Sequence, residues 1–179
     1  MKRTPSVLLV GAVLLAVVVA TWAGCAASTK GTYVRATVGG RPISFTEPLA
    51  TLSPIDGFLA VQGFHYIGQE REELLSVNIP KPRTGGRWPL RASGDGAWAA
   101  HFVREITTDH IEAYHTDENH VGTVVITRFD QTLKVVEGTF EFDAILSNRR
   151  GPRQGPDTVH VRKGAFRARY SIDRPSSSE

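Results

Sequence analysis

Histidine and carboxylate side chains concentrate in residues 101–120 of the chain. Imidazole and carboxylate groups together are ligands that suit Zn²⁺ and similar divalent ions. The stretch lacks the two histidines four residues apart that a zinc-binding helix carries, and on a strand His110 and His115 would point to opposite faces. We therefore expect a polar, solvated strand and turn, with a metal site on His115, Asp117 and His120 as the alternative. The other residues of this kind are His101, Glu105, Asp109, Glu112 and Glu118.

Four aromatic residues form a second group of candidates. Trp88, Trp98, Tyr66 and Tyr114 could line an open groove for a sugar or an apolar ligand, as in the mouths of β-barrels. Aromatic side chains in a β-protein more often pack in the core, and that is the simpler interpretation. Trp88 and Trp98 are the ligand-binding candidates of this group.

Basic residues are frequent in the last third of the chain. Arg167 and Arg169 alternate with Phe166, Ala168 and Tyr170, so the two arginines share one face of a predicted strand. The planar guanidinium group binds phosphate and carboxylate well, which would suit anionic lipid headgroups, lipopolysaccharide or acidic glycans. An ordinary charged outer face that keeps a sheet soluble is the simpler interpretation. The other basic residues of this third are Arg149, Arg150, Arg153, Arg162 and Lys163.

Motifs of known enzyme chemistry are missing from the sequence. It contains no Gly-x-Ser-x-Gly elbow, no phosphate-binding glycine loop and no calcium-binding loop, and its single cysteine lies in the leader. We therefore predict a protein that is not an enzyme and carries no cofactor.

The first 25 residues have the layout of a secretory signal. Lys2 and Arg3 precede an apolar run over residues 7–20, and Ala23 and Gly24 then precede Cys25. The end of this leader, T-W-A-G-C-A, resembles a bacterial lipoprotein signal, which is cut before the cysteine that then carries the lipid. The resemblance implies a signal peptide over residues 1–24 and a lipidated Cys25 at the head of a short tether, residues 25–31.

Alternatives to lipidation remain for this leader. Trp22 stands where lipoprotein signals usually have an aliphatic residue. An uncleaved transmembrane anchor needs about 20 apolar residues, which residues 7–27 could supply. A plain secretory signal is the other alternative. Removing the leader takes away Lys2 and Arg3 and no acid, so the net charge falls from +3 to +1. A nucleic-acid partner is therefore not expected.

Alternation of apolar and polar residues predicts strands over most of residues 32–173. Residues 32–38 and 41–45, joined by Gly39-Gly40, form a predicted hairpin with Pro42 on an edge strand. Further strands are predicted over residues 58–67, with a close approach at Gly63, and over 74–79, 97–103 and 110–116. Residues 80–88, 117–120 and 147–157 are the loops in which function should be sought.

The central hairpin, residues 121–144, has the clearest alternation. Val124 and Ile126 should face inward with Phe140 and Phe142, and Gly138 should form a bulge or close contact. Residues 130–133 are its predicted turn.

The closing strand, residues 158–172, changes the parity of its apolar residues. Val159 and Val161 are apolar at odd positions, whereas Phe166 and Tyr170 are apolar at even ones. A strand cannot change face without an extra residue, so we predict a bulge at Lys163-Gly164. The pattern as a whole predicts one all-β domain over residues 32–173, an antiparallel β-sandwich or flattened β-barrel of about 8–10 strands after an N-terminal signal helix. Residues 174–179 should be a disordered tail.

Four segments carry a resemblance to a known family: V-R-A-T-V-G-G-R-P-I-S-F, A-Y-H-T-D-E-N-H-V-G-T-V-V-I-T-R-F-D, V-V-E-G-T-F-E-F-D-A and V-H-V-R-K-G-A-F. They resemble an uncharacterised family of all-β bacterial surface lipoproteins of unknown function. The resemblance covers most of residues 33–166. It implies the fold and the location, and it brings no catalytic residues.

Together these observations favour a lipid-anchored protein of the bacterial cell envelope that works by binding or interaction. Its expected partners are the membrane, through the lipid anchor, and an envelope protein or glycan. Ala26 and Ala27 lack the acidic residue of inner-membrane retention signals, so the lipoprotein resemblance implies the outer membrane. The alternatives are a β-barrel carrier of a small apolar or glycan ligand and a metal-assisted hydrolase that uses the histidines between His101 and His120.

Overall fold

A computed structural model describes residues 31–68, 72–92, 99–107 and 109–173. Residues 105–107 are described by their backbone only. The predicted signal peptide, Cys25, most of the tether, Trp98 and the tail lie outside these residues. Within them the chain is all-β, with 69% of residues in strands and no helix. The search of these residues finds no helix that is long and apolar enough to cross a membrane.

The described residues form one sheet of 11 strands. The strands are β1 (Tyr33–Val38), β2 (Arg41–Phe45), β3 (Glu47–Leu52), β4 (Phe58–Tyr66), β5 (Glu72–Pro80), β6 (Arg87–Leu90), β7 (Ala100–Thr107), β8 (His110–His115), β9 (Gly122–Asp130), β10 (Val135–Arg150) and β11 (Thr158–Ile172). The all-β prediction is confirmed. The predicted number of strands is too low because β3 and β6, which contain Pro48 and Pro89, had not been recognised as strands.

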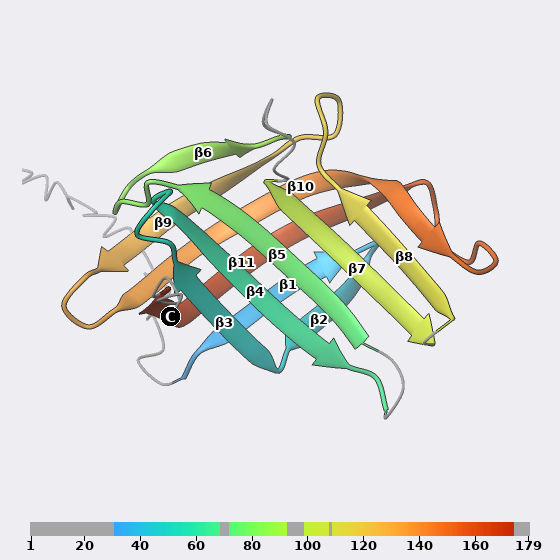
Figure 1. Cartoon of the computed structure of the whole chain (residues 1–179), viewed down its shortest axis with the longest axis horizontal. Helices are drawn as coiled ribbons and strands as arrows, with labels where there is room; N and C mark the ends of the chain where they lie inside the picture. The colour runs from blue at the N-terminus through green and yellow to red at the C-terminus, as the bar shows by residue number, and fades with distance from the viewer. Residues whose placement is uncertain (1–30, 69–71, 93–98, 108, 174–179) are drawn as a thin grey trace, which may run out of the picture.

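The sheet folds into two crossing layers and closes on itself. Its order is β2-β1-β11-β3-β4-β5-β7-β8-β10-β9-β6, and β10 also pairs with β11. The layer β3-β4-β5-β7-β8 runs across the layer that contains β1, β9, β10 and β11 (Figure 1). The result is a flattened barrel with the β1–β2 and β6–β9 pairs as extensions. The β11–β3 pairing is parallel, so the sheet is mixed and not purely antiparallel as predicted.

Two long strands close the barrel because each of them changes partner. Along one edge, β10 pairs with β9 up to Phe142 and with β8 from Ile145 onward. Along one edge of β11, the pairing passes from β1 to β3 at Tyr170. Strands that switch neighbours in this way make the corners at which two crossing layers join.

The barrel has two distinct ends. The basal end is formed by the turns 53–57, 81–86 and 131–134, the start of β1 and the last residues of β11, and it lies on the left in Figure 1. The distal end is formed by the β1–β2 turn, the β7–β8 turn and the loop 151–157, and it lies on the right. This loop is shorter than the predicted 147–157 because β10 continues to Arg150.

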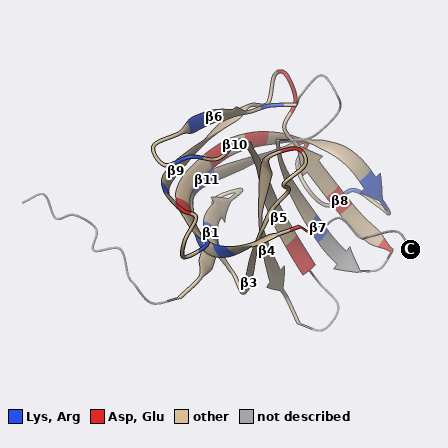
Figure 2. Ribbon diagram, turned by 60° about the vertical axis from the view of Figure 1, so that its left-hand side comes forward, with Lys and Arg blue, Asp and Glu red and all other residues tan. Residues whose placement is uncertain are grey.

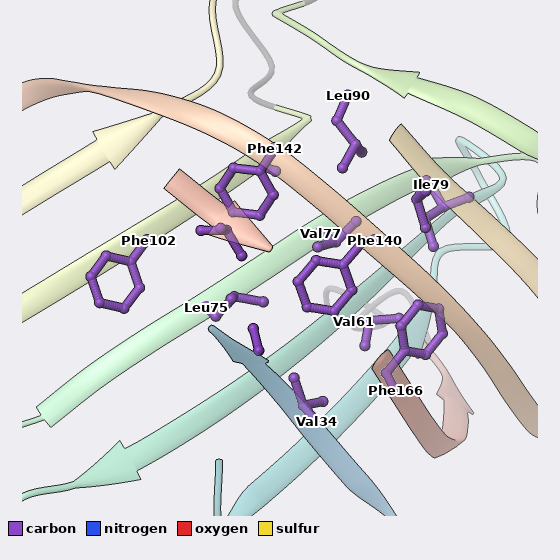
Figure 3. Packing of buried hydrophobic residues seen from close by; sticks show 14 of the residues in the cluster. Val34, Val61, Leu75, Val77, Ile79, Leu90, Phe102, Phe140, Phe142 and Phe166 are labelled. Atoms are coloured by element: carbon purple, nitrogen blue, oxygen red, sulfur yellow. The ribbon is translucent and has the colours of Figure 1, made fainter. Parts of the chain in front are cut away.

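The central hairpin has the predicted inward residues. Val124, Ile126, Phe140 and Phe142 are all buried. The register shifts between Glu137 and Gly138 because β9 carries an extra residue, Thr127, opposite them. A Cβ at Gly138 would lie 2.4 Å from the carbonyl oxygen of Val125, which confirms the close contact at the glycine. The paired residues are Val124 with Phe140, and Ile126 with Gly138. The rings of Phe140, Phe142 and Phe166 stack at centroid distances of 6.2 and 6.3 Å in the middle of the core (Figure 3).

The predicted bulge in β11 is also confirmed. Arg35 pairs with Ala165 and Thr37 with Arg162, so the two residues between them on β11 face one residue of β1. Lys163 has a φ of 52°. Valines before the bulge and Phe166, Ala168 and Tyr170 after it are therefore all buried. Ile172 is 46% exposed, since it ends the strand.

The first hairpin and β4 pack as expected. β2 is the outermost strand at its edge of the sheet, which tolerates Pro42. Gly63 lies against Phe45, and a Cβ at Gly63 would lie 2.7 Å from the Cβ of Phe45. β5 begins two residues before the predicted strand over residues 74–79, because Glu72 and Glu73 already belong to it.

Candidate functional site

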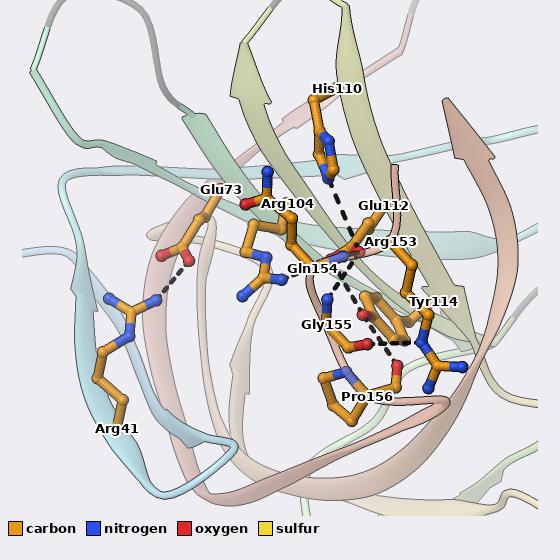
Figure 4. A network of polar contacts seen from close by, with 10 residues as sticks. All are labelled: Arg41, Glu73, Arg104, His110, Glu112, Tyr114, Arg153, Gln154, Gly155 and Pro156. Carbon is orange, nitrogen blue, oxygen red and sulfur yellow. Dashed lines mark hydrogen bonds and ion pairs between the residues drawn. The ribbon is translucent and has the colours of Figure 1, made fainter. Parts of the chain in front are cut away.

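Charged side chains line the interior of the barrel at its distal end. Glu73 on β5, Arg104 on β7 and Glu112 on β8 are successive register partners. Each has the same parity along its strand as core residues such as Leu75 and Phe102, so all three point inward. Register partners lie side by side on one face of a sheet. We call Glu73, Arg104 and Glu112 the charged row (Figure 4).

Glu112 is the most completely bound member of the charged row. Its side chain is 0% exposed. Oε1 accepts hydrogen bonds of 2.8 Å from the backbone N–H groups of Gln154 and Gly155. Oε2 accepts a 2.5 Å bond from Nη2 of Arg104 and a 3.3 Å bond from the hydroxyl of Tyr114. Every oxygen of this carboxylate is therefore engaged.

These contacts determine the charge of Glu112. Burial on its own raises the pKa of Glu112, but the N–H groups of Gln154 and Gly155 and the Arg104 guanidinium lower it to about 2. Burial and the Glu112 carboxylate raise the pKa of Tyr114 to about 12. At neutral pH the site thus holds an ionised carboxylate and a neutral phenol, and neither group can exchange a proton there.

The loop 151–157 closes over this carboxylate. A Cβ at Gly155 would lie 2.3 Å from the Tyr114 hydroxyl and 2.5 Å from Oε2 of Glu112, so the backbone can approach only because this residue is glycine. The Tyr114 hydroxyl also lies 3.2 Å from the carbonyl oxygen of Pro156, so its single proton is shared between this carbonyl and Oε2 of Glu112. Within the loop, Nε of Arg153 donates to the carbonyl of Gly155 at 3.0 Å. Glu112 therefore fixes the loop that covers the distal end.

Glu73 is paired with an arginine from another part of the barrel. Arg41, at the start of β2, reaches Oε1 of Glu73 (Figure 4). The Glu73 side chain is 1% exposed, and its Oε2 has no hydrogen-bond partner among the described residues. The Arg41 side chain is half exposed, so the charge pair joins the interior to the solvent at the distal end.

The histidines of residues 101–120 do not converge. His110 is buried, with Nε2 3.7 Å from Oε1 of Glu112. His101 and His115 are register partners on β7 and β8, and burial and the neighbouring His115 lower the pKa of His101. Nδ1 of His120 lies 2.9 Å from Oδ1 of Asp117 within the turn after β8.

Two predictions about this stretch can be compared with the structure. Among the described residues, no group of three or more histidines, cysteines, aspartates and glutamates could hold a metal ion. His115 is thus not brought together with Asp117 and His120 as a metal site. The predicted solvated strand is wrong, because the polar residues His110, Glu112 and Thr116 of this segment are buried. They face inward: Glu112 accepts from Arg104 of the charged row, and the Thr116 hydroxyl bonds to the backbone of Ala100.

The aromatic candidates do not share a groove within the described part of the chain. Trp88 is partly buried against the core and lies over Gly86, where a Cβ would be 1.9 Å from its ring. Tyr66 is exposed, and its hydroxyl donates to Glu47 at 3.3 Å. Tyr114 belongs to the distal network described above. Trp98 lies outside the described residues.

Arg167 and Arg169 line a hollow of about 320 Å³ at the basal end. We call it the arginine hollow, and its principal lining residues are Arg128, Leu133, Val135, Arg167 and Arg169. Arg128 lies 2.8 Å from Asp130, and Arg167 lies 3.1 Å from Glu137. Gly31 and Thr32, where the described chain begins, complete the wall.

The other basic residues of the last third lie elsewhere. Arg149 and Arg150 pair with β8 at the far end of β10. Arg153 belongs to the loop 151–157, and Nη2 of Arg162 lies 2.5 Å from Oδ1 of Asp143. These basic residues therefore do not form one surface, because the length of β10 and β11 separates Arg149 and Arg150 from Arg167 and Arg169.

Sequence reasoning did not identify the charged row. Glu73 continues the inward parity of Leu75, and Arg104 continues that of Phe102, so the alternation itself contained the signal. Charged residues at the end of an apolar alternation were interpreted as solvated. Only the register between β7 and β8 shows that Arg104 neutralises Glu112, and only the fold brings Arg41 of β2 to Glu73.

Comparison of the chain with protein-family models, with curated proteins and with solved structures finds no match. The resemblance to bacterial surface lipoproteins therefore stays a prediction.

Proposed function

We propose that this protein is a lipid-anchored domain of the bacterial cell envelope that acts by binding or interaction and not by catalysis. The observation that carries the proposal is Ala23-Gly24-Cys25 at the end of a basic and apolar leader, a few residues before the first strand of the domain. Lipidation of Cys25 would hold the protein at a membrane, which we propose to be the outer membrane. Its partner would be an envelope protein or a glycan.

The protonation state of the polar groups at the distal end supports a binding function over a catalytic one. General acid–base catalysis needs a group that gains or loses a proton near the working pH. Glu112 is held ionised by its four contacts and has no free lone pair directed at a substrate. The convergence of histidines and carboxylates that a metal-assisted hydrolase requires does not occur among the described residues.

The carrier alternative gains no support from the described core. A carrier of a small apolar or glycan ligand needs an internal cavity of several hundred Å³. In the middle of the barrel, side chains from both layers contact one another, with Phe140, Phe142 and Phe166 among them (Figure 3). The arginine hollow opens on the outside of the sheet and not into this core.

Mass spectrometry of the protein from the membrane fraction tests the anchor. We expect a mature chain that begins with acylated Cys25, and we expect Cys25→Ser to leave the membrane fraction. Ser28→Ala, a change of similar size in the tether, should stay membrane-bound. A mature N-terminus at any other residue, or a Cys25→Ser protein that remains in the membrane fraction, would overturn the proposal.

Calorimetric titration of the purified protein with Zn²⁺ tests the absence of metal chemistry. We expect no stoichiometric binding to the native chain. Binding of one Zn²⁺ per chain that His115→Ala or His120→Ala removes would restore the metal-assisted hydrolase as the better hypothesis.

A further inference from the structure

Large apolar side chains are exposed at the basal end of the barrel. Ile55 is 76% exposed at the tip of the β3–β4 turn, Leu133 is 59% exposed in the β9–β10 turn, and Ile172 is 46% exposed at the end of β11. The backbone brings these segments together: Asp173 N–H donates to the carbonyl of Leu52, and Tyr170 N–H donates to the carbonyl of Lys134. The apolar tips therefore belong to one end of the molecule.

Basic side chains lie beside these apolar tips. Lys134 follows Leu133, Lys81 donates its N–H to Gly57 in the β3–β4 turn, and Arg169 lines the arginine hollow; all three side chains are exposed. The acidic residues of the same end are Asp56, Asp130, Glu137 and Asp173, of which Asp130 and Glu137 are paired with Arg128 and Arg167. Figure 2, turned so that this end comes forward, marks the basic residues in blue and the acidic ones in red.

The described chain also begins at this end. Gly31 and Thr32 form part of the wall of the arginine hollow. Cys25 and Gly31 are six positions apart along the chain, so Cys25 is at most about 20 Å from the hollow even when the segment is fully extended. An acyl anchor on Cys25 would therefore keep the basal end, and no other end of the barrel, close to the membrane surface.

We propose that the basal end docks on an anionic lipid surface. Ile55, Leu133 and Ile172 enter the interface between headgroups and acyl chains, and the arginine hollow takes a headgroup phosphate. Isolated apolar tips beside basic residues are the chemistry that binds such a surface. Arg128 and Arg167 are already paired with carboxylates, so Arg169 is the guanidinium group of the hollow that would meet the phosphate. This inference rests on the proposed lipid anchor, which determines which end meets the membrane.

The test uses the lipidated full-length chain in vesicles of phosphatidylcholine, with or without about one third phosphatidylglycerol. Because lipid occupies the only native cysteine, Leu133→Cys supplies a single thiol for a polarity-sensitive dye. We expect the dye to shift to the blue and to be quenched by lipid-borne quenchers in the anionic vesicles. Ile55→Cys should behave in the same way, whereas Val121→Cys, an exposed position at the other end of β9, should stay in water.

Charge reversal tests the basic residues of this end. Lys134→Glu with Arg169→Glu should lower the equilibrium constant for docking by at least about fivefold for each residue, the scale of losing one Lys or Arg at an anionic surface. Arg91→Glu with Arg150→Glu reverses the same number of exposed charges away from the basal end and should change nothing.

Several results would overturn the docking. They are a dye at Leu133→Cys that stays in water in every vesicle, an equal shift at Val121→Cys, and a shift that follows protein density instead of lipid charge, which would indicate contact between copies. The acyl mass of the same sample reports separately on the proposed anchor. A lipidated chain with a solvent-exposed basal end would refute the docking and leave the proposed function standing.

Discussion

Substitution of Glu112 by glutamine should remove a pH-dependent part of the free energy of unfolding. The pKa of this carboxyl is 4.5 in its ordinary state and about 2 in the fold. At about 1.4 kcal/mol per pKa unit, the difference corresponds to about 3 kcal/mol of stabilisation at pH 7. Because the pKa is lower in the folded chain, this stabilisation is fully present above pH 4.5. It is lost as the pH falls, to less than about 0.5 kcal/mol at pH 2.

Urea unfolding at several pH values measures this contribution. We expect Glu112→Gln to lower the free energy of unfolding by about 3 kcal/mol at pH 7, a shift of the midpoint on the order of 1 to 2 M. The gap between wild type and variant should narrow between pH 4.5 and pH 2. Glu141→Gln, at an exposed position on the outer face of β10, controls for the loss of a carboxylate and should run parallel to the wild type. A gap that stays constant down to pH 2 would refute the argument that Glu112 is held ionised.

Two further changes probe the backbone around these features. Gly155→Ala should lower the free energy of unfolding by about 1–3 kcal/mol, because the new Cβ meets the hydroxyl of Tyr114 and pushes the loop off Glu112. Urea unfolding measures this change, and an unchanged midpoint would contradict it. Lys163→Val should lower the free energy of unfolding by about 1–2 kcal/mol, since a β-branched residue must then adopt the φ of 52°, whereas Lys163→Gly should leave it unchanged. Equal stability of these two variants in urea would show that the bulge is not strained.

The individual strands could be predicted from the sequence because a half-buried strand alternates apolar residues on its inner face with polar residues on its outer face. The parity change in β11 required an extra residue, and the structure has it at Lys163. The central hairpin and Gly63 followed from the same logic. β3 and β6 were missed because Pro48 and Pro89 interrupt short segments that carry little alternation. In the structure both strands pair with others.

The closure of the barrel could not be predicted in this way. The parallel pairing of Tyr170 with Ala50 joins segments far apart in the chain, and alternation says only which side of a strand is inside. The same limit applies to the charged row. A glutamate at an inward position such as Glu112 is costly to bury unless it is paired, and its partner Arg104 is set by the register of β7 with β8. Because the sequence does not give that register, we predicted a solvated strand, in which Glu112 would need no buried partner.

The two ends of the barrel differ in a way that bears on where a partner would bind. At the distal end the interior charges are closed in by the chain's own loop, which Glu112 holds through two backbone N–H groups. At the basal end Ile55, Leu133 and Ile172 remain exposed. If the basal end faces lipid, the loop 151–157 projects away from the membrane with Arg150 and Arg153 exposed beside it. An envelope partner with acidic groups would then meet this loop first. Because the loop is fastened to a buried carboxylate, it would present Arg153 in a fixed position beside Arg150 and lose little conformational entropy on binding.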